Sequence, residues 1–192
     1  MTNTTEIKNG LRERKSGGKG QKKMKKGMTR RERQVTEPEE IRKILDKCKI
    51  LHLGLVDEEE PYIVPMNYGY TMEGDNLTLY MHCAVKGRKL DIIRKNPKVF
   101  FQMECDVEPF EGRVACQYGT TYSSVMGRGV AEIVENVEEK KTALSVFMKS
   151  QTGKDFTFDD RMVSIVTIIK ERALGYTAKR RPLPAAMLEN GE

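Results

Sequence analysis

Several features that would assign the 192-residue chain to a common functional class are scarce or missing. There are only two histidines and four cysteines, and no Cys-x-x-Cys pair, so the spacing typical of a structural zinc site is missing and we expect no metal. No apolar run approaches the ~18 residues needed for a membrane-spanning helix, and no internal repeat is visible. Unpaired thiols in a chain without an apolar signal region are typical of a reducing compartment, so we expect a soluble cytoplasmic protein with no membrane partner.

Positive charge is scarce outside the beginning of the chain. The net charge is +6, but residues 1–30 alone hold ten Lys or Arg and two Glu, so the remainder carries 24 basic and 26 acidic residues. Residues 10–27 are rich in Gly, Ser and Lys and nearly free of apolar residues, which predicts a disordered basic arm over residues 1–28. Such an arm can bind nucleic acid or an anionic membrane surface. It can equally be a solvated tail, a cloning remnant, or the result of a start codon placed ahead of Met28.

The hydrophobic pattern of the rest predicts short strands joined by turns, with three helices around them. Helices are expected over residues 37–48, with Thr36 as N-cap, and over 87–96 and 137–150. Strands are expected over residues 50–56, 62–70, 77–82, 99–104, 121–135, 162–169 and 173–178. Gly127 and Gly129 indicate a bulge or a close backbone approach in the longest strand. This pattern favours a mainly β fold, an antiparallel barrel of six or seven strands with peripheral helices, in one domain over residues 29–182. Residues 183–192 are expected to form a tail.

A candidate phosphate site lies where the strand over 77–82 leads into the next helix, at Lys86-Gly87-Arg88-Lys89. Gly87 leaves room for a ligand to approach the backbone, Arg88 can form a bidentate clamp, and Lys89 adds a point charge. The helix that follows directs its N-terminal N–H groups toward the same place. Three cations in four residues are also typical of a solvated surface.

Pro65, Met66, Asn67 and Tyr68 lie in the middle of the strand before that turn. Pro65 cannot donate to a strand ladder, so one side of this strand should be an edge or face a ligand. Asn67 offers both a donor and an acceptor, which suits a flat heteroaromatic ring. An ordinary edge strand has the same pattern.

His82 ends the next strand, close to the phosphate candidate. It could donate to a cofactor ring or a phosphate, or supply a proton near neutral pH, although a histidine at a strand end is often structural. His52 lies within an apolar strand and is expected in the core. The hydroxyls of Ser123 and Ser124, at the start of the longest strand, could complete the anion site.

In order and spacing, these segments resemble the FMN-binding split-barrel superfamily of pyridoxamine phosphate oxidases, most closely its nitroimidazole-resistance (Nim) branch. The similarity extends from about Thr29 to Pro182, and the first thirty residues have no counterpart in it. Its ordered pieces are residues 30–33, 39–48, 53–56, 61–70, 79–84, 87–91 and 122–131. No single piece is specific, but their combination is.

The resemblance implies a split β-barrel homodimer with FMN in two clefts shared between the subunits. In that pattern Arg88 and Lys89, within the segment 86–89, bind the FMN phosphate, with a hydroxyl from Ser124 or Ser123. Main chain and side chains from Pro65 to Tyr68 meet the isoalloxazine. His82 matches the histidine that the Nim branch places beside the flavin.

Three functions therefore follow as hypotheses. The first is an FMN-dependent oxidoreductase that takes electrons from a nicotinamide cofactor or another reductant and reduces a small acceptor, for which the resemblance suggests nitroaromatic compounds. The second is a flavin- or haem-binding module without turnover. The third is binding of nucleic acid or of a partner through the basic arm, which no basic stripe or interleaved aromatic residues in the rest of the sequence support.

Overall fold

The computed structural model describes residues 28–185. The basic arm predicted over residues 1–28 lies almost entirely outside the described residues, as does most of the tail predicted over 183–192. None of the described helices combines the length and hydropathy needed to cross a membrane.

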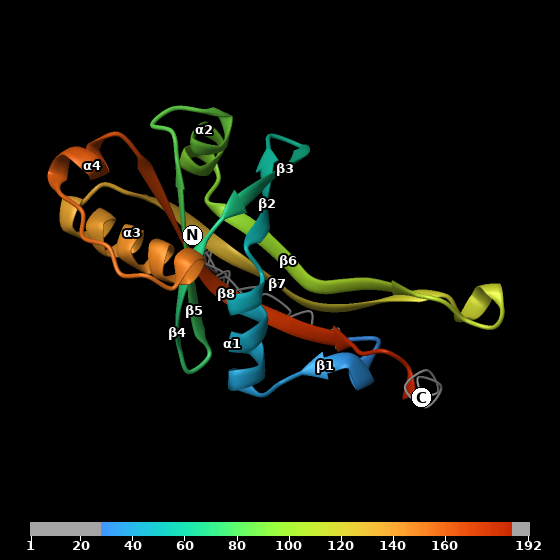
Figure 1. The fold of residues 1–192 in the computed structure, drawn as a ribbon. Helices are drawn as coiled ribbons and strands as arrows, with labels where there is room; N and C mark the ends of the chain where they lie inside the picture. Colours follow the sequence, from blue (N-terminus) through green and yellow to red (C-terminus); the bar gives the residue numbers. More distant parts are fainter. Residues whose placement is uncertain (1–27, 186–192) are drawn as a thin grey trace, which may run out of the picture.

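A single antiparallel sheet forms most of the described structure (Figure 1). Its strands are β1 (Gln34–Val35), β2 (Ile50–Asp57), β3 (Glu60–Asn67), β4 (Gly69–Glu73), β5 (Asn76–Cys83), β6 (Lys98–Phe110), β7 (Gly119–Val134) and β8 (Thr167–Arg181). They are ordered β3-β2-β6-β7-β8-β5-β4, with the short β1 beside β8. This confirms the predicted mainly β fold of antiparallel strands.

The sheet is a barrel that its ladders leave open on one side. β3 and β4 stand at opposite ends of the strand order, yet only Tyr68 separates them in the sequence. The two ends of the curled sheet must therefore meet at Tyr68. Within the described residues, β3 pairs only with β2 and β4 only with β5, so no ladder joins β3 to β5. The prediction of one strand over residues 62–70 is wrong, because the chain changes ladders at Tyr68.

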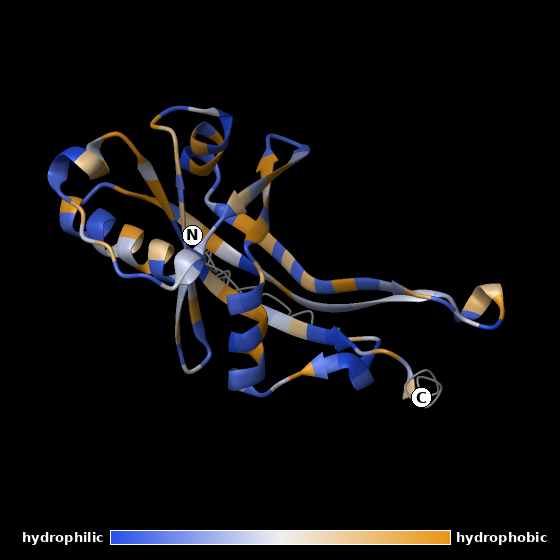
Figure 2. Cartoon of the chain, in the orientation of Figure 1, coloured by the Kyte–Doolittle hydropathy of each residue, from blue (hydrophilic) through white to orange (hydrophobic). Residues whose placement is uncertain are grey.

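Alternating side chains fill the barrel. Successive inward positions of β2 and β5 are occupied by buried leucine and methionine, and Figure 2 shows the alternation of hydrophobic and hydrophilic residues along the strands. His52, expected in the core, instead lies on the outer face because it alternates with the buried Leu51 and Leu53.

The helices lie around the barrel. They are α1 (Pro38–Lys47), α2 (Arg88–Lys95), α3 (Val137–Thr152) and α4 (Asp160–Ser164), with 3₁₀ turns η1 (Arg31–Arg33) and η2 (Ala115–Gln117). The residue before α1 is Glu37, with Pro38 in the first helical position, so the predicted N-cap at Thr36 is one residue too early.

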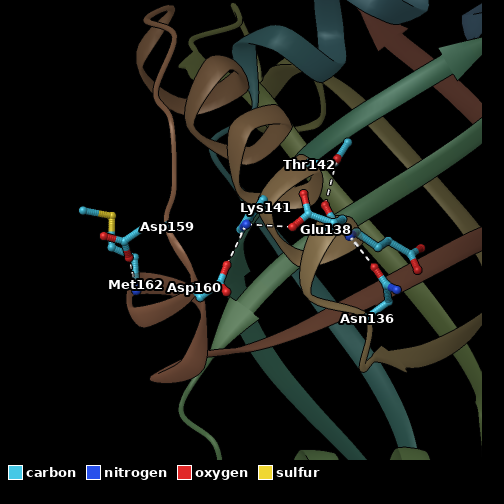
Figure 3. Close-up of polar contacts among 8 residues, drawn as sticks. Asn136, Glu138, Lys141, Thr142, Asp159, Asp160 and Met162 are labelled. Carbon is cyan, nitrogen blue, oxygen red and sulfur yellow. Dashed lines mark hydrogen bonds and ion pairs between the residues drawn. The ribbon is translucent and has the colours of Figure 1, made fainter.

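Polar contacts hold α3 and α4 together (Figure 3). The Nζ of Lys141 lies 2.7 Å from both the Glu138 and Asp160 carboxylates. Asp159 accepts a hydrogen bond from the backbone N–H of Met162 and so begins α4. This short helix occupies the start of the strand predicted over residues 162–169, and β8 then continues without a break through the predicted gap before residue 173.

The two longest neighbouring strands are closely packed. A bulge interrupts the pairing of β7 and β8 between Arg128 and Gly129, as the two glycines predicted. A Cβ on Gly127 would lie 2.7 Å from the Gly175 carbonyl oxygen, so a side chain is excluded there. β6 and β7 also form a long hairpin whose outer half projects from the barrel (Figure 1), with η2 at its tip.

Candidate functional site

Gly87 forms the junction between β5 and α2. Its φ of 151° and ψ of 156° lie in a region that essentially only glycine adopts, so the backbone conformation itself requires glycine. A Cβ built on Gly87 would meet nothing within 4 Å, so the backbone is open to approach from this side. The N–H groups of Leu90 and Asp91 donate to the Gly87 carbonyl oxygen over 2.9 and 3.4 Å, so those of Arg88 and Lys89 are the ones that α2 itself leaves for a ligand.

Arg88 is positioned by the hairpin of β2 and β3. Its Nε donates to Oδ2 of Asp57 over 2.8 Å, and its guanidinium lies 4.7 Å from the centroid of the Tyr62 ring. The contact with Asp57 uses one of the five N–H groups of the guanidinium. Because the side chain is half-exposed, an incoming anion can reach the others.

Lys86 and Lys89 flank this position differently. Lys86 is exposed, whereas Lys89 is partly buried near Cys83. Burial raises the pKa of the Cys83 thiol, and the positive charge of Lys89 partly offsets that rise. The ammonium group of Lys89 is therefore close to the end of β5.

His82 faces α3 from the outer side of β5. Met81 points into the barrel, so its neighbour His82 points outward, where its ring meets Phe147 edge to face at 4.6 Å between centroids. Burial lowers the pKa of His82, although the side chain remains accessible to solvent. At neutral pH the imidazole is therefore neutral, with one donor and one acceptor nitrogen.

The segment from Pro65 to Tyr68 presents alternate residues to the two faces of β3. Pro65 and Asn67 are exposed, whereas Met66 and Tyr68 are buried in the core. The hydroxyl of Tyr68 donates to the Leu45 carbonyl over 2.6 Å and the residue is 1% exposed, so the Tyr68 side chain is not placed to meet a ligand. Pro65 pairs with His52 on one side, and β3 ends the strand order on the other, which confirms the predicted edge.

The end of α3 fixes the break between β3 and β4. Nε2 of Gln151 donates to the carbonyl oxygens of Tyr68, over 2.7 Å, and Lys49, over 3.2 Å. The N–H of Tyr70 donates to Oγ of Ser150. These contacts span some eighty positions in the sequence, so no local pattern signals them, and sequence reasoning missed them.

One part of the predicted site comes together at the open side of the barrel. Gly69 is paired with Tyr80, and continuing that register backward would bring Asn67 level with His82. β3 instead diverges to pair with β2, while still making contacts with β5. β3 therefore approaches the end of β5 that carries His82, and Tyr62 of β3 meets Arg88 at the start of α2. Pro65 and Asn67 lie on the opposite face of β3 from Tyr62.

Ser123 and Ser124 lie elsewhere. Cys83, at the end of β5, is paired with Thr167, whereas Ser123 is paired with Arg180 at the other end of β8. At ~3.3 Å per residue, that separation is roughly 40 Å of strand. Ser123 is buried and accepts a hydrogen bond from Nε of Arg180. One chain does not bring these serines to Arg88 and Lys89, so a shared ligand would require a second copy.

An antiparallel barrel left open between two strands, with a cationic strand-to-helix junction beside the opening, defines the class of split-barrel proteins. A family model described as pyridoxamine 5′-phosphate oxidase matches residues 37–165. The chain therefore belongs to the pyridoxamine 5′-phosphate oxidase family, and the predicted superfamily is confirmed.

Solved structures agree with this assignment. A candidate 5-nitroimidazole antibiotic resistance protein from Bacteroides thetaiotaomicron is similar with 29% identity and a TM-score of 0.66, over 77% of this chain and 86% of that one. Two others share the fold at 17% identity. They are the FAD and heme binding protein from Mycobacterium smegmatis (TM-score 0.65, 83% and 80% covered) and the flavocytochrome Anf3 from Azotobacter vinelandii (0.63, 82% and 75%). A search of curated proteins gives no match.

Proposed function

We propose that the chain binds FMN and uses it to reduce a small acceptor. The observation that carries this proposal is the start of α2, where Gly87 leaves the backbone open and Arg88 and Lys89 follow at once. These residues fit a phosphate, because a helix N-terminus and two cations all favour a dianion. A bound flavin would supply the redox chemistry, accepting electrons from a nicotinamide cofactor or another reductant and passing them to the acceptor.

The protein side chains would hold and orient the ring. The exposed face of β3, with Pro65 and Asn67, offers a flat wall, although Nδ2 of Asn67 already donates to the Lys49 carbonyl over 3.0 Å. Because the pKa of His82 is lowered, the imidazole is suited at neutral pH to hydrogen bonding rather than to proton donation. Proton donation by His82 would grow only as the pH falls toward that lowered pKa.

The acceptor class comes from similarity. The 29% identical protein from Bacteroides thetaiotaomicron is described as a candidate 5-nitroimidazole antibiotic resistance protein, and most of both chains is covered. We therefore propose nitroaromatic compounds as acceptors of this chain.

All four cysteines are free, and the cytoplasmic location expected from the sequence stays a prediction.

A second copy would complete the site. The outer faces of β2, β3 and β6 form an apolar groove of about 630 Å³, lined by Val56, Ile63, Phe100 and their neighbours. The separation of Ser123 and Ser124 from Arg88 and Lys89 also requires two copies if all four contact one cofactor. The proposed assembly is therefore a homodimer with shared clefts.

The first test is FMN binding. We expect purified protein to show flavin absorption or to take up added FMN, and Arg88→Ala and Lys89→Ala each to weaken binding at least tenfold in a fluorescence titration. Arg94→Ala and Lys95→Ala, at the opposite end of α2, serve as matched controls and should leave the affinity unchanged. Colourless protein that does not take up FMN would contradict the proposal, and so would full affinity in both site variants.

Kinetics separates the oxidoreductase from the alternative, a flavin- or haem-binding module without turnover. Anaerobic stopped-flow mixing with NADH or NADPH should bleach the flavin absorption, and a nitroaromatic compound should restore it. If no reductant bleaches a bound flavin, the binding module is the better description.

A further inference from the structure

The two ends of the described chain meet at a basic surface. Gln34 of β1 is paired with Lys179 of β8, and Val35 with Ala178, so η1 packs beside the last residues of β8. The basic patch formed in this way consists of Arg31, Arg33, Lys179 and Arg181. Arg180 alternates with its neighbours and lies on the opposite face of β8, beside the buried Ser123. Figure 1 shows β1 beside the end of β8, and Figure 2 colours η1 and that end as strongly hydrophilic. These cations come from segments about 150 positions apart, so no stripe is visible in the sequence.

Much of this charge is not neutralised locally. Arg180 contacts the Glu40 carboxylate over 2.9 Å, and Arg33 lies 3.8 Å from Glu32. In the described part of the chain, no carboxylate lies within ion-pair distance of Arg31, Lys179 or Arg181. Three cations are therefore available to an external anion.

The patch is also held in a defined geometry. The guanidinium of Arg181 lies 4.9 Å from the centroid of the Phe110 ring, which orients it. Tyr122 is the register partner of Arg181, and Ser124 and Gln34 are those of Lys179. Paired residues of neighbouring strands share a face, so hydroxyl and amide groups accompany the cations there.

The sequence carries further positive charge directly before the patch along the chain. Residues 1–27 contain nine Lys or Arg and two Glu, and they join the patch through Met28, three positions before Arg31.

From this arrangement we infer that the patch binds the phosphate backbone of a nucleic acid without sequence preference. Arginine forks match phosphate oxygens, and the polar partners on the same face suit phosphate and sugar contacts. An anionic membrane is the less suitable partner because, among the exposed large hydrophobic residues of the described chain, only Tyr118 and Met126 border residues 30–36, 119–125 and 177–185, and none lies within them. The patch adjoins Ser123 and Ser124, which the proposed function assigns to the cofactor of a second copy, so the two proposals share this end of β7 and β8.

The test is fluorescence anisotropy of the full chain with a labelled 20-nucleotide single-stranded RNA between 50 and 300 mM salt. We expect affinity to fall steeply with salt, because cations that contact phosphates displace counterions. The triple variant Arg31→Gln, Lys179→Gln and Arg181→Gln should bind at least tenfold more weakly. Each phosphate contact with a single strand contributes ~0.7 to the slope of log K against log salt, so loss of three contacts in the triple variant should reduce that slope by about 2.

A matched control removes the same charge elsewhere, through Lys95→Gln, Lys154→Gln and Arg161→Gln, three exposed cations outside the patch. It should retain the native affinity within about threefold, and thermal melts should show that both variants are folded. Three results would overturn the inference. They are no RNA binding at 50 mM salt, equal losses in both variants, and binding to phosphatidylserine vesicles without binding to RNA. Full affinity in the triple variant, with loss on removal of residues 1–27, would also overturn it by assigning the binding to the arm alone.

Discussion

Glu171 lies inside the barrel on β8, between Leu79 of β5 and Ala131 of β7 in the sheet register. It is 0% exposed, and neither carboxyl oxygen has a hydrogen-bond partner among the described residues. Its side chain occupies the space that Gly129 leaves, since a Cβ there would lie 2.7 Å from the Glu171 Cγ. Burial raises the pKa of Glu171 to about 8, so the side chain is neutral in the folded protein at neutral pH.

This single residue predicts a pH dependence of stability. The unfolded chain releases the Glu171 proton near the ordinary value of 4.5, whereas the folded chain keeps it up to about 8. The folded state therefore binds more protons in this window, and its stability should fall there by up to ~1.4 kcal/mol per pH unit, levelling off above. Urea unfolding from pH 5 to 9 should show this fall, and Glu171→Gln should flatten it. The exposed Glu135→Gln is the control, and parallel profiles for all three proteins would contradict the assignment.

The candidate phosphate site at the start of α2 could be predicted from the sequence because its residues are neighbours along the chain. A strand end, a glycine, two cations and a helix start all lie between His82 and Asp91. The orientation of Tyr68 could not be predicted from the sequence. It follows from the change of ladder at that residue and from its hydrogen bond with the distant Gln151. The roles of all these residues toward a cofactor stay predictions.

At the level of elements, the errors lie where tertiary contacts override local pattern. The charged run Lys170-Glu171-Arg172 suggested a gap between two strands. Instead, Nζ of Lys170 contacts Glu139 and Glu132 over 2.6 and 3.4 Å, and Glu171 is buried, so β8 runs through. The apolar run after Met162 suggested a strand, but Asp159 starts a helical turn that buries Val163. β2, β5, β7 and the first half of β6 were predicted because period-two alternation is a local signal, whereas the short β1 was not predicted.

Gly69 links two elements that the sequence does not connect. It stands at the start of β4, and α3 passes so close that a Cβ would lie 2.7 Å from the Phe147 nitrogen and 2.8 Å from the Val146 carbonyl oxygen. These are backbone atoms of a helix and cannot rotate away. The close approach also places Phe147 against His82.

We therefore expect Gly69→Ala to shift α3 and to lower the free energy of unfolding by about 1–3 kcal/mol, the usual cost of overpacking. Amide hydrogen exchange in α3 should accelerate. The pKa of His82, followed by NMR, should move back toward 6.5 as Phe147 withdraws. Gly175→Ala is the matched control, because its Cβ would meet nothing within 4 Å. Equal stability of the two variants would show that α3 does not constrain this turn.

At the scale of the whole molecule, two surfaces of different character lie at different parts of one sheet. The outer faces of β2, β3 and β6 carry the apolar groove, with Ile63 64% and Phe100 49% exposed. The end of β8 carries the basic patch. An apolar groove on a sheet face is typical of a site that a partner covers. The basic patch lies at another edge of the sheet, so a polyanion bound there would stay away from the groove.

The groove provides the last prediction, which concerns assembly. Burying Ile63 and Phe100 against a second copy would remove apolar surface from water, and a carboxylate placed there would remain unpaired in the interface. We expect light scattering to give twice the 22.0 kDa chain mass for the native protein and 22.0 kDa for Ile63→Asp combined with Phe100→Asp.

Ile165→Asp is the control for that variant, since Ile165 is 71% exposed and lies outside the groove, and it should remain a dimer. If the clefts are shared between subunits, the monomeric variant should also lose FMN affinity while Arg88 and Lys89 are intact. A monomer that binds FMN as tightly as the native protein would show that one chain holds the cofactor alone. A native protein of 22.0 kDa would remove the dimer altogether, and the positions of Ser123 and Ser124 would then exclude both serines from the phosphate site.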